Sequence, residues 1–347
     1  MPNLWPKNWR LFGQFLAISI GFASIFEWLA IPLGALMGPI LGAGLLAYFK
    51  NDREGPGHYA QGGAILVVGL ALGAQVTPDF IERALHWPGS MAILIVTMCI
   101  ILWVVGWLNR WLFRLDAISA HMSASPGNLS VALTLTDHYQ GQLPQVAVFQ
   151  SLRLTLLTIL VPIALHQLSG LPSTSAIPSI SGPVNLSWIA VFLAGALIAF
   201  GLDRFKVPTP SLIAGALAAG IPSAMGWIEV QIPSTLFLGA MMIFGWKIGI
   251  DTIRQGLTVV SRALGPAILS TAVAVCIAVI GAWGVSTVLD IPLIDTVLAF
   301  MPGAFQVMPV LALEQGADGL YVTTHHLIRV IAMGSLMPIF AVYWART

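Results

Sequence analysis

One stretch of this chain occurs twice, and this repetition constrains the fold more than any other feature. Pro126-Gly127 and Arg153 recur as Pro302-Gly303 and Arg329, in both cases 176 positions later (302 − 126, 329 − 153). No gap is needed to align the two copies. Each copy holds a Pro-Gly break, an apolar segment, a short polar connection and a second apolar segment that carries the arginine. Because the repeat spans half of the chain, the protein is an internal duplication.

The composition places both copies in a lipid bilayer. Hydrophobic residues make up 57% of the 347 and charged residues only 8%, whereas soluble domains carry roughly a quarter charged residues. Apolar stretches of about 20 residues, long enough to cross a bilayer, follow one another and leave no room for a soluble catalytic or DNA-binding domain. The net charge of +1 provides no basic surface for nucleic acid.

Six apolar elements are predicted in each half, bounded by charge, proline or glycine. The first membrane repeat comprises residues 1–167 and the second residues 187–347, and the uncharged, Pro- and Ser-rich residues 168–186 form a linker. The elements are expected at about 11–29, 31–49, 60–77, 88–109, 117–137 and 143–166, and again at about 187–202, 207–227, 233–250, 263–289, 293–313 and 319–343.

The loop cations indicate how the halves are oriented. If all six elements of each half crossed the bilayer, the loop cations would divide seven against five, which contradicts their concentration in short cytoplasmic loops. If each Pro-Gly element dips in and returns, eleven lie inside and only Arg83 outside. The sequence therefore predicts an all-α polytopic membrane protein of two inverted repeats with about five transmembrane helices each. Both termini are expected in the cytoplasm and the linker outside.

Each Pro-Gly pair should interrupt a helix, because proline removes a backbone donor and glycine accepts unusual dihedral angles. The result would be either a re-entrant element or a broken spanning helix. A half-helix that begins after the break would direct free N–H groups and a positive dipole end at an anion. A simple kink in an ordinary spanning helix is the alternative interpretation.

Arg153 and Arg329 lie about two turns into their apolar segments, where a cation costs roughly 3 kcal/mol or more. Each should face the protein interior or a cavity, and snorkelling to the interface is the alternative. Gln150 and His326 precede the arginines by three positions and share their helix faces. The predicted substrate-binding residues are Pro126, Gly127, Asn128, Ser130, Gln150, Arg153, Pro302, Gly303, Gln306, His326 and Arg329.

No metal, cofactor or catalytic residue is predicted. His325 and His326 are adjacent, but neighbouring helical residues point about 100° apart and seldom ligate one ion. Proton coupling through His326, or a hydrogen bond from it to substrate, is the preferred interpretation. Lys247 lies in an apolar element and is expected to pair with Asp251 one turn later.

The segments SPGNLSVALTL and VAVFQSLRL, and in the second copy MPGAFQVMPVLALEQGAD and HHLIRV, resemble the bacterial membrane AbrB family. The resemblance covers the whole chain. The pattern P-G-x-x-x-x-[MV] with H-x-x-R-[VL] is met in the second copy, whereas the first has Gln150 where the family usually has histidine. The resemblance implies a polytopic inner-membrane protein, and members are catalogued as ammonia monooxygenases or AbrB-type regulators.

The residues favour a secondary transporter of a small anionic solute that moves one repeat against the other. A membrane protein with an indirect regulatory role on gene expression is the first alternative. A membrane-embedded monooxygenase is the second, but it would need a cofactor, and the sequence shows no repeated His/carboxylate constellation to hold one. The expected partners are a small-molecule solute and the lipid bilayer, without nucleic acid, and assembly into a homo-oligomer stays open.

Overall fold

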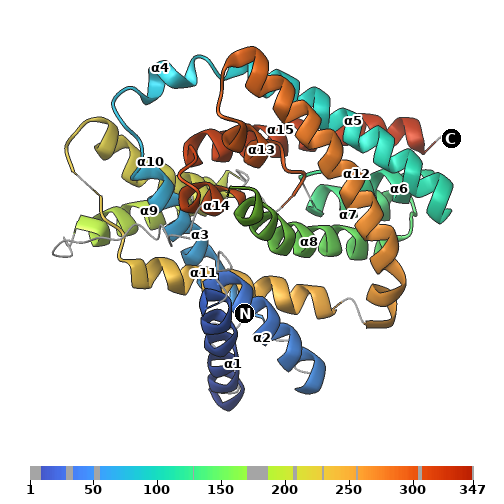
Figure 1. The fold of residues 1–347 in the computed structure, drawn as a ribbon, viewed down its shortest axis with the longest axis horizontal. Helices are drawn as coiled ribbons and strands as arrows, with labels where there is room; N and C mark the ends of the chain where they lie inside the picture. Colours follow the sequence, from blue (N-terminus) through green and yellow to red (C-terminus); the bar gives the residue numbers. More distant parts are fainter. Residues whose placement is uncertain are drawn as a thin grey trace. The chain divides into compact units, whose positions relative to one another are not determined.

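A computed structural model describes residues 9–28, 34–50, 55–127, 129–169, 187–205, 209–228, 230–254, 257–303 and 307–345 (Figure 1). Within these ranges the chain is all-helical, as predicted, and contains no strand. The helices are α1 (Trp9–Trp28), α2 (Gly34–Lys50), α3 (His58–Gly73), α4 (Phe80–Ala84), α5 (Pro88–Phe113), α6 (Ala117–Ala124), α7 (Leu129–His138), α8 (Leu143–Ser169), α9 (Ser187–Arg204), α10 (Pro210–Ala224), α11 (Ser234–Arg254), α12 (Leu257–Leu289), α13 (Leu293–Phe300), α14 (Met308–Glu314) and α15 (Gly319–Trp344).

Several of these helices have the dimensions and composition of membrane spans. In the described part of the chain, five are long and apolar enough to cross a membrane. Four more apolar helices are shorter, at 10–17 residues. The five candidate spans are Pro88–Phe113, Leu143–Leu165, Ser187–Arg204, Ser261–Leu289 and Gly319–Trp344.

The duplication extends to the places where helices begin and end. Helix α13 begins and ends 176 positions after α6 (293 − 117, 300 − 124). Helices α5 and α12 also end at this spacing (289 − 113), and the next residue of each, Arg114 or Asp290, adopts a left-handed conformation with φ of 55° or 54°. A left-handed residue after the last helical turn is a common helix stop. The repeated sequence therefore repeats its local structure as well.

The chain forms two compact units, and each unit takes helices from both halves of the sequence. Unit 1 comprises Met1–Leu85, Val161–Arg254 and Pro309–Leu320. Unit 2 comprises His86–Leu160, Gln255–Met308 and Tyr321–Thr347. The predicted linker lies mostly outside the described residues, since α8 continues to Ser169 and the next described residue is Ser187. The boundaries between the two repeats therefore stay predictions.

In unit 1, α3 packs tightly against α10 because α3 presents glycines at the contact. A Cβ atom on Gly69 would lie 2.3 Å from the carbonyl oxygen of Leu212, and one on Gly73 would lie 2.4 Å from that of Ala216. Only glycine allows backbones to approach this closely, as in the Gly-xxx-Gly contacts of membrane helices. Since the later glycine meets the later partner, α3 and α10 run parallel.

The same contact recurs between α11 and α2. A Cβ atom on Gly245 would lie 2.3 Å from the carbonyl oxygen of Leu36, and one on Gly249 would lie 2.4 Å from that of Ile40. These glycines follow Gly69 and Gly73 by 176 positions (245 − 69, 249 − 73), so the duplication repeats the helix contact itself. Helices α11 and α2 are therefore parallel too.

In unit 2, the counterpart helices α5 and α12 pack against each other in the antiparallel sense. Near the start of α5, a Cβ atom on Gly89 would lie 3.6 Å from the Cδ1 atom of Leu289, at the end of α12. Farther along α5, Asn109 accepts a hydrogen bond at Oδ1 from Ser270, which lies earlier in α12. As α5 advances, its contacts therefore move backwards along α12.

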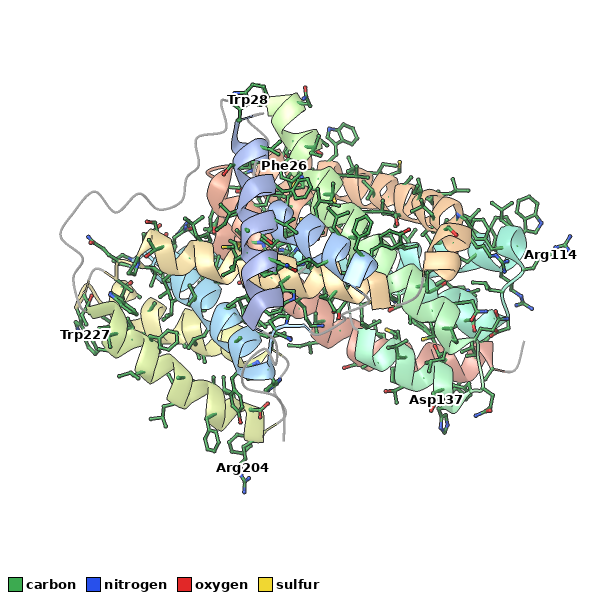
Figure 2. All side chains as sticks on the ribbon, turned by 90° about the horizontal axis from the view of Figure 1, so that it is seen from below. Phe26, Trp28, Arg114, Asp137, Arg204 and Trp227 are labelled. Carbon is green, nitrogen blue, oxygen red and sulfur yellow. The ribbon has the colours of Figure 1, made fainter. Side chains whose placement is uncertain are left out.

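The outer surfaces of the helices are apolar. On α9, Leu197 and Phe200 are each 74% exposed, and α9 is the least buried of the candidate spans. Arg204 at the end of α9 and Trp227 after α10 project away from the helices (Figure 2). An apolar helix surface bounded by arginine and tryptophan is typical of a span that faces lipid and ends at the interface.

Three ion pairs lie among the described residues of unit 1. The Nε atom of Arg83 is 3.0 Å from Oδ2 of Asp79, and its Nη1 atom is 3.1 Å from Oδ2 of Asp318. Arg83, the one loop cation that the predicted topology places outside, is thus paired with two carboxylates. Lys247 pairs with Asp251 one turn later, which confirms the pairing predicted from the sequence.

Candidate functional site

The first Pro-Gly break divides an apolar element into two short helices. Helix α6 ends at Ala124 and α7 begins at Leu129, so the element predicted at 117–137 is not one continuous helix. Pro126 is buried, and Gly127 has φ of +122°, a conformation that residues with a side chain rarely adopt. Proline and glycine therefore break the helix for the reasons that their chemistry suggests.

The α6–α7 element returns to the place where it began. The backbone N–H of Gln142, which follows α7, donates to the hydroxyl of Ser119 in the first turn of α6 at 2.6 Å. Asp116 caps the same turn by accepting from the backbone N–H of Ser119. Because its two ends are joined in this way, the first Pro-Gly element is a helical hairpin.

The second break has the same form. Helix α13 ends at Phe300 and α14 begins at Met308, again dividing an element that was predicted as one range, 293–313. Pro302 and Gly303 are buried, and the N–H of Gly303 donates to the carbonyl of Met301 at 2.9 Å. Three predicted site residues cannot be placed: Asn128, Gln306 and the side chain of Ser130 lie outside the described residues.

Arg153 holds the C-terminal end of α6. Its Nη1 atom donates to the carbonyl of Ala124 at 3.0 Å, and its Nη2 atom donates to the carbonyl of Ser125 at 2.6 Å. Gln150 accepts from Nη2 at Oε1 (2.5 Å) and donates from Nε2 to the carbonyls of Met122 and Ser125 at 2.8 and 3.1 Å. The predicted pair therefore forms one hydrogen-bonded group on one helix face.

Arg329 and His326 make the matching contacts with α13. The Nη1 atom of Arg329 donates to the carbonyl of Met301, and Nη2 hydrogen-bonds to Nδ1 of His326 at 2.8 Å. The Nε2 atom of His326 hydrogen-bonds to the carbonyl of Leu298 at 3.0 Å. Leu298 and Met301 follow Met122 and Ser125 by 176 positions (298 − 122, 301 − 125), so the contact pattern itself is duplicated.

The ends of α6 and α13 explain how the protein accommodates two buried arginines. The last carbonyl groups of a helix have no partner within it, and the C-terminal end carries about half a negative charge. Arg153 is only 6% exposed and Arg329 only 1%, so neither side chain snorkels to an interface. Both arginines instead cap the ends of buried half-helices, a role that the sequence interpretation did not foresee.

The partners of His326 define its protonation state. A carbonyl oxygen can only accept, so Nε2 carries the hydrogen that it donates to Leu298. A guanidinium group can only donate, so Nδ1 accepts from Arg329 and carries no hydrogen. The hydrogen bonds thus assign a neutral Nε2–H imidazole, which is chemically equivalent to the amide of Gln150 in the first copy.

His325 faces a different environment from its neighbour. Its Nδ1 atom bonds the carbonyl of Tyr321 at 2.8 Å, and its Nε2 atom bonds the hydroxyl of Ser90 at 2.7 Å. Its ring also packs against Trp87. The two adjacent histidines therefore do not converge on one point. Among the described residues, no group of three His, Cys, Asp or Glu side chains could hold a metal ion.

The two copies meet at the glycines that follow the prolines. A Cβ atom on Gly127 would lie 3.3 Å from Nε of Arg329, and one on Gly303 would lie 3.8 Å from Nε of Arg153. Each glycine therefore lies beside the arginine of the other copy. The Nε atoms of both arginines have no hydrogen-bond partner among the described residues.

A polar connection in the same unit was missed from the sequence. Asn109 in α5 donates from Nδ2 to the hydroxyl of Ser123 in α6 at 2.9 Å and accepts from Ser270 in α12. Asn109 therefore links α5 and α12 to α6, the first helix of the broken element. An asparagine at the end of a long apolar run was the available signal, but its partners lie 14 and 161 positions away.

Comparisons with known proteins agree on one family. Residues 36–345 match the family described as "Transition state regulatory protein AbrB". The chain is 23% identical over 321 residues to the Escherichia coli (strain K12) protein named "Putative regulator AbrB", which covers 92% of this chain and 90% of that protein. It is also 23% identical over 368 residues to the Bacillus subtilis (strain 168) protein named "Uncharacterized protein YhjN", with coverage of 97% and 93%.

Proposed function

From the premise that this chain belongs to the AbrB family, we propose that it is a secondary transporter that moves a small anionic solute across the bacterial inner membrane. Its two halves are inverted repeats that each cross the membrane five times. One Pro-Gly hairpin per half lies at the substrate site, both termini are cytoplasmic, and the linker is outside.

The directions of helix packing carry this proposal. If all six elements of each half crossed the membrane, α5 and α12 would run parallel, whereas α3 would oppose α10 and α2 would oppose α11. The contacts run the other way in all three pairs: α5 and α12 are antiparallel, and the other two pairs are parallel. These directions fit halves that each cross five times, because an odd number of crossings inverts the second half.

The α6–α7 hairpin supports the same count of crossings. Its ends meet at Ser119 and Gln142, so it contributes no crossing to the first half. Irregular backbone at membrane depth requires partners from the protein, and Arg153 and Gln150 supply them. Broken helices at the centre of inverted repeats are where secondary transporters bind their substrates.

Two buried arginines favour an anion as the solute. Within the described part of the chain, the recorded ion pairs include neither Arg153 nor Arg329. Buried charges without a counter-ion are costly, and an anionic ligand would lower this cost. A regulatory role draws support from the description of the family and from the name of the Escherichia coli relative, and it could arise indirectly from transport of a signal molecule.

Cysteine labelling tests the inversion at one pair of counterpart positions. Arg114 and Asp290 are both exposed and follow the ends of α5 and α12. We expect Arg114→Cys to react with an impermeant thiol reagent only from the cytoplasmic side and Asp290→Cys only from outside, in a background that lacks Cys99 and Cys276. Reaction of both from the same side would refute the inverted arrangement.

Transport is tested in proteoliposomes with radiolabelled small organic anions and an imposed proton or sodium gradient. We expect saturable uptake of at least one anion above protein-free liposomes, with no uptake of organic cations of similar size. Flux of cations but not anions would contradict the proposed solute class. A folded, correctly inserted protein without flux of any probe would favour the regulatory alternative.

A further inference from the structure

We propose that the Nε–H groups of Arg153 and Arg329 together bind one small monocarboxylate between Gly127 and Gly303. The proposal deepens the transporter function, and it rests on that function only for the route by which the ligand reaches this buried site.

The available donors are few and well defined. A guanidinium group has five N–H donors, four on the Nη atoms and one on Nε. Backbone carbonyls and the neighbouring side chain take up the Nη atoms of Arg153, and those of Arg329 are engaged in the same way. The Nε–H of each arginine lacks a described partner although both side chains are more than nine-tenths buried. An unsatisfied buried donor is costly, which indicates an acceptor that the described residues do not supply.

The donors lie beside two glycines. An added Cβ would lie 3.3 Å from Nε of Arg329 at Gly127 and 3.8 Å from Nε of Arg153 at Gly303, so the backbone of each break lies close to the Nε–H of the arginine from the opposite copy. A side chain at either position would cover this Nε–H.

The charge of the site selects the valence of the ligand. Two arginines contribute two positive charges, and the ends of α6 and α13 that they cap offset about half a charge each. An excess of about one positive charge remains, and the two guanidinium groups repel each other. One monoanion neutralises this excess, whereas a dianion would leave a buried negative charge. A carboxylate has two oxygens, so it can accept from one Nε–H of each copy.

The test uses thermal unfolding of the whole protein in detergent, followed by the fluorescence of its 12 tryptophans. Sodium acetate and sodium lactate are compared with sodium chloride, sodium sulfate and sodium dimethyl phosphate at equal ionic strength. We expect a saturable rise in Tm with the two carboxylates only. A rise with dimethyl phosphate in their place would assign the site to a lipid phosphodiester and overturn the carboxylate proposal.

Gly303→Ala isolates the site without changing a charge. The added Cβ would lie 3.8 Å from Nε of Arg153, and its closest contact is the flexible end of Leu157 at 3.0 Å. Gly303 is not among the glycines with positive φ, so alanine introduces no backbone strain of the kind expected at Gly127. The control is Gly265→Ala in α12, where a Cβ would meet nothing within 4 Å.

We expect the carboxylate affinity to fall at least tenfold in Gly303→Ala and to stay unchanged in Gly265→Ala. Equal carboxylate-induced shifts in wild type and Gly303→Ala would overturn the proposal. So would the absence of any shift, or equal shifts with chloride or sulfate. Carboxylate binding without transport would refute the transporter function and leave the site intact. Transport without Gly303-dependent carboxylate binding would refute the proposed site and leave the transporter function intact.

Discussion

Replacing Gly69 by alanine should force two helices of unit 1 apart. The new Cβ would lie 2.3 Å from the carbonyl oxygen of Leu212, whereas ordinary contacts begin at 3.4 Å, so α3 and α10 must separate by about 1 Å or distort locally. A gap of this size forfeits a quarter to a half of the dispersion energy of the contacts that it opens. Overpacking of this kind costs about 1–3 kcal/mol.

Gly63 in the same helix provides the matched control, because a Cβ there would meet nothing within 4 Å. Both substitutions gain the helix propensity of alanine, about 1 kcal/mol, so their difference isolates the packing cost. In detergent, Gly69→Ala should therefore melt below Gly63→Ala by roughly 2–12 °C. The counterpart pair, Gly245→Ala and Gly239→Ala in α11, should show the same difference, since Gly239 is equally open.

Equal melting temperatures for Gly69→Ala and Gly63→Ala would refute this reasoning. The close parallel contact of α3 with α10 would then be wrong, and the inverted arrangement would lose one of its three supporting pairs. If Gly69→Ala is destabilised and Gly245→Ala is not, the glycines are duplicated in the sequence but the close helix contact is not duplicated in the structure.

Three further predictions concern polar contacts. His326→Gln should keep the wild-type Tm, because Gln150 makes the equivalent hydrogen bonds in the first copy, and uptake should lose any pH dependence that arises from protonation of His326. Arg329→Lys should lower stability by about 1–3 kcal/mol in thermal unfolding, because an ammonium group cannot span both Met301 and His326. Asp318→Asn should lower the free energy of unfolding by less than about 1 kcal/mol, and should leave it unchanged in high salt, because Arg83 is 42% exposed at that ion pair. A larger loss of stability that does not depend on salt would show that the ion pair is desolvated.

Local composition accounts for the parts of the fold that the sequence predicted. Apolar runs bounded by charge and proline located the helices within a few residues, because a helix that is buried in lipid or protein must be apolar along its length. The breaks at Pro126-Gly127 and Pro302-Gly303 were predicted from backbone chemistry alone, as was the pairing of Lys247 with Asp251 one turn away. In each case the information lies within a few positions along the chain.

The tertiary structure decided what the buried arginines contact. Arg153 and Arg329 find backbone carbonyls 28 or 29 positions away, and a carbonyl carries no signal in the sequence because every residue has one. Gly127 and Gly303 meet the arginines of the opposite copy only because the fold brings the two copies together. The sequence by itself thus determined that two cations are buried near two helix breaks. Only the packing of helices from both halves decided that the cations cap helix ends and that the Nε–H of each has no partner among the described residues, because that outcome depends on which groups are brought within hydrogen-bond distance.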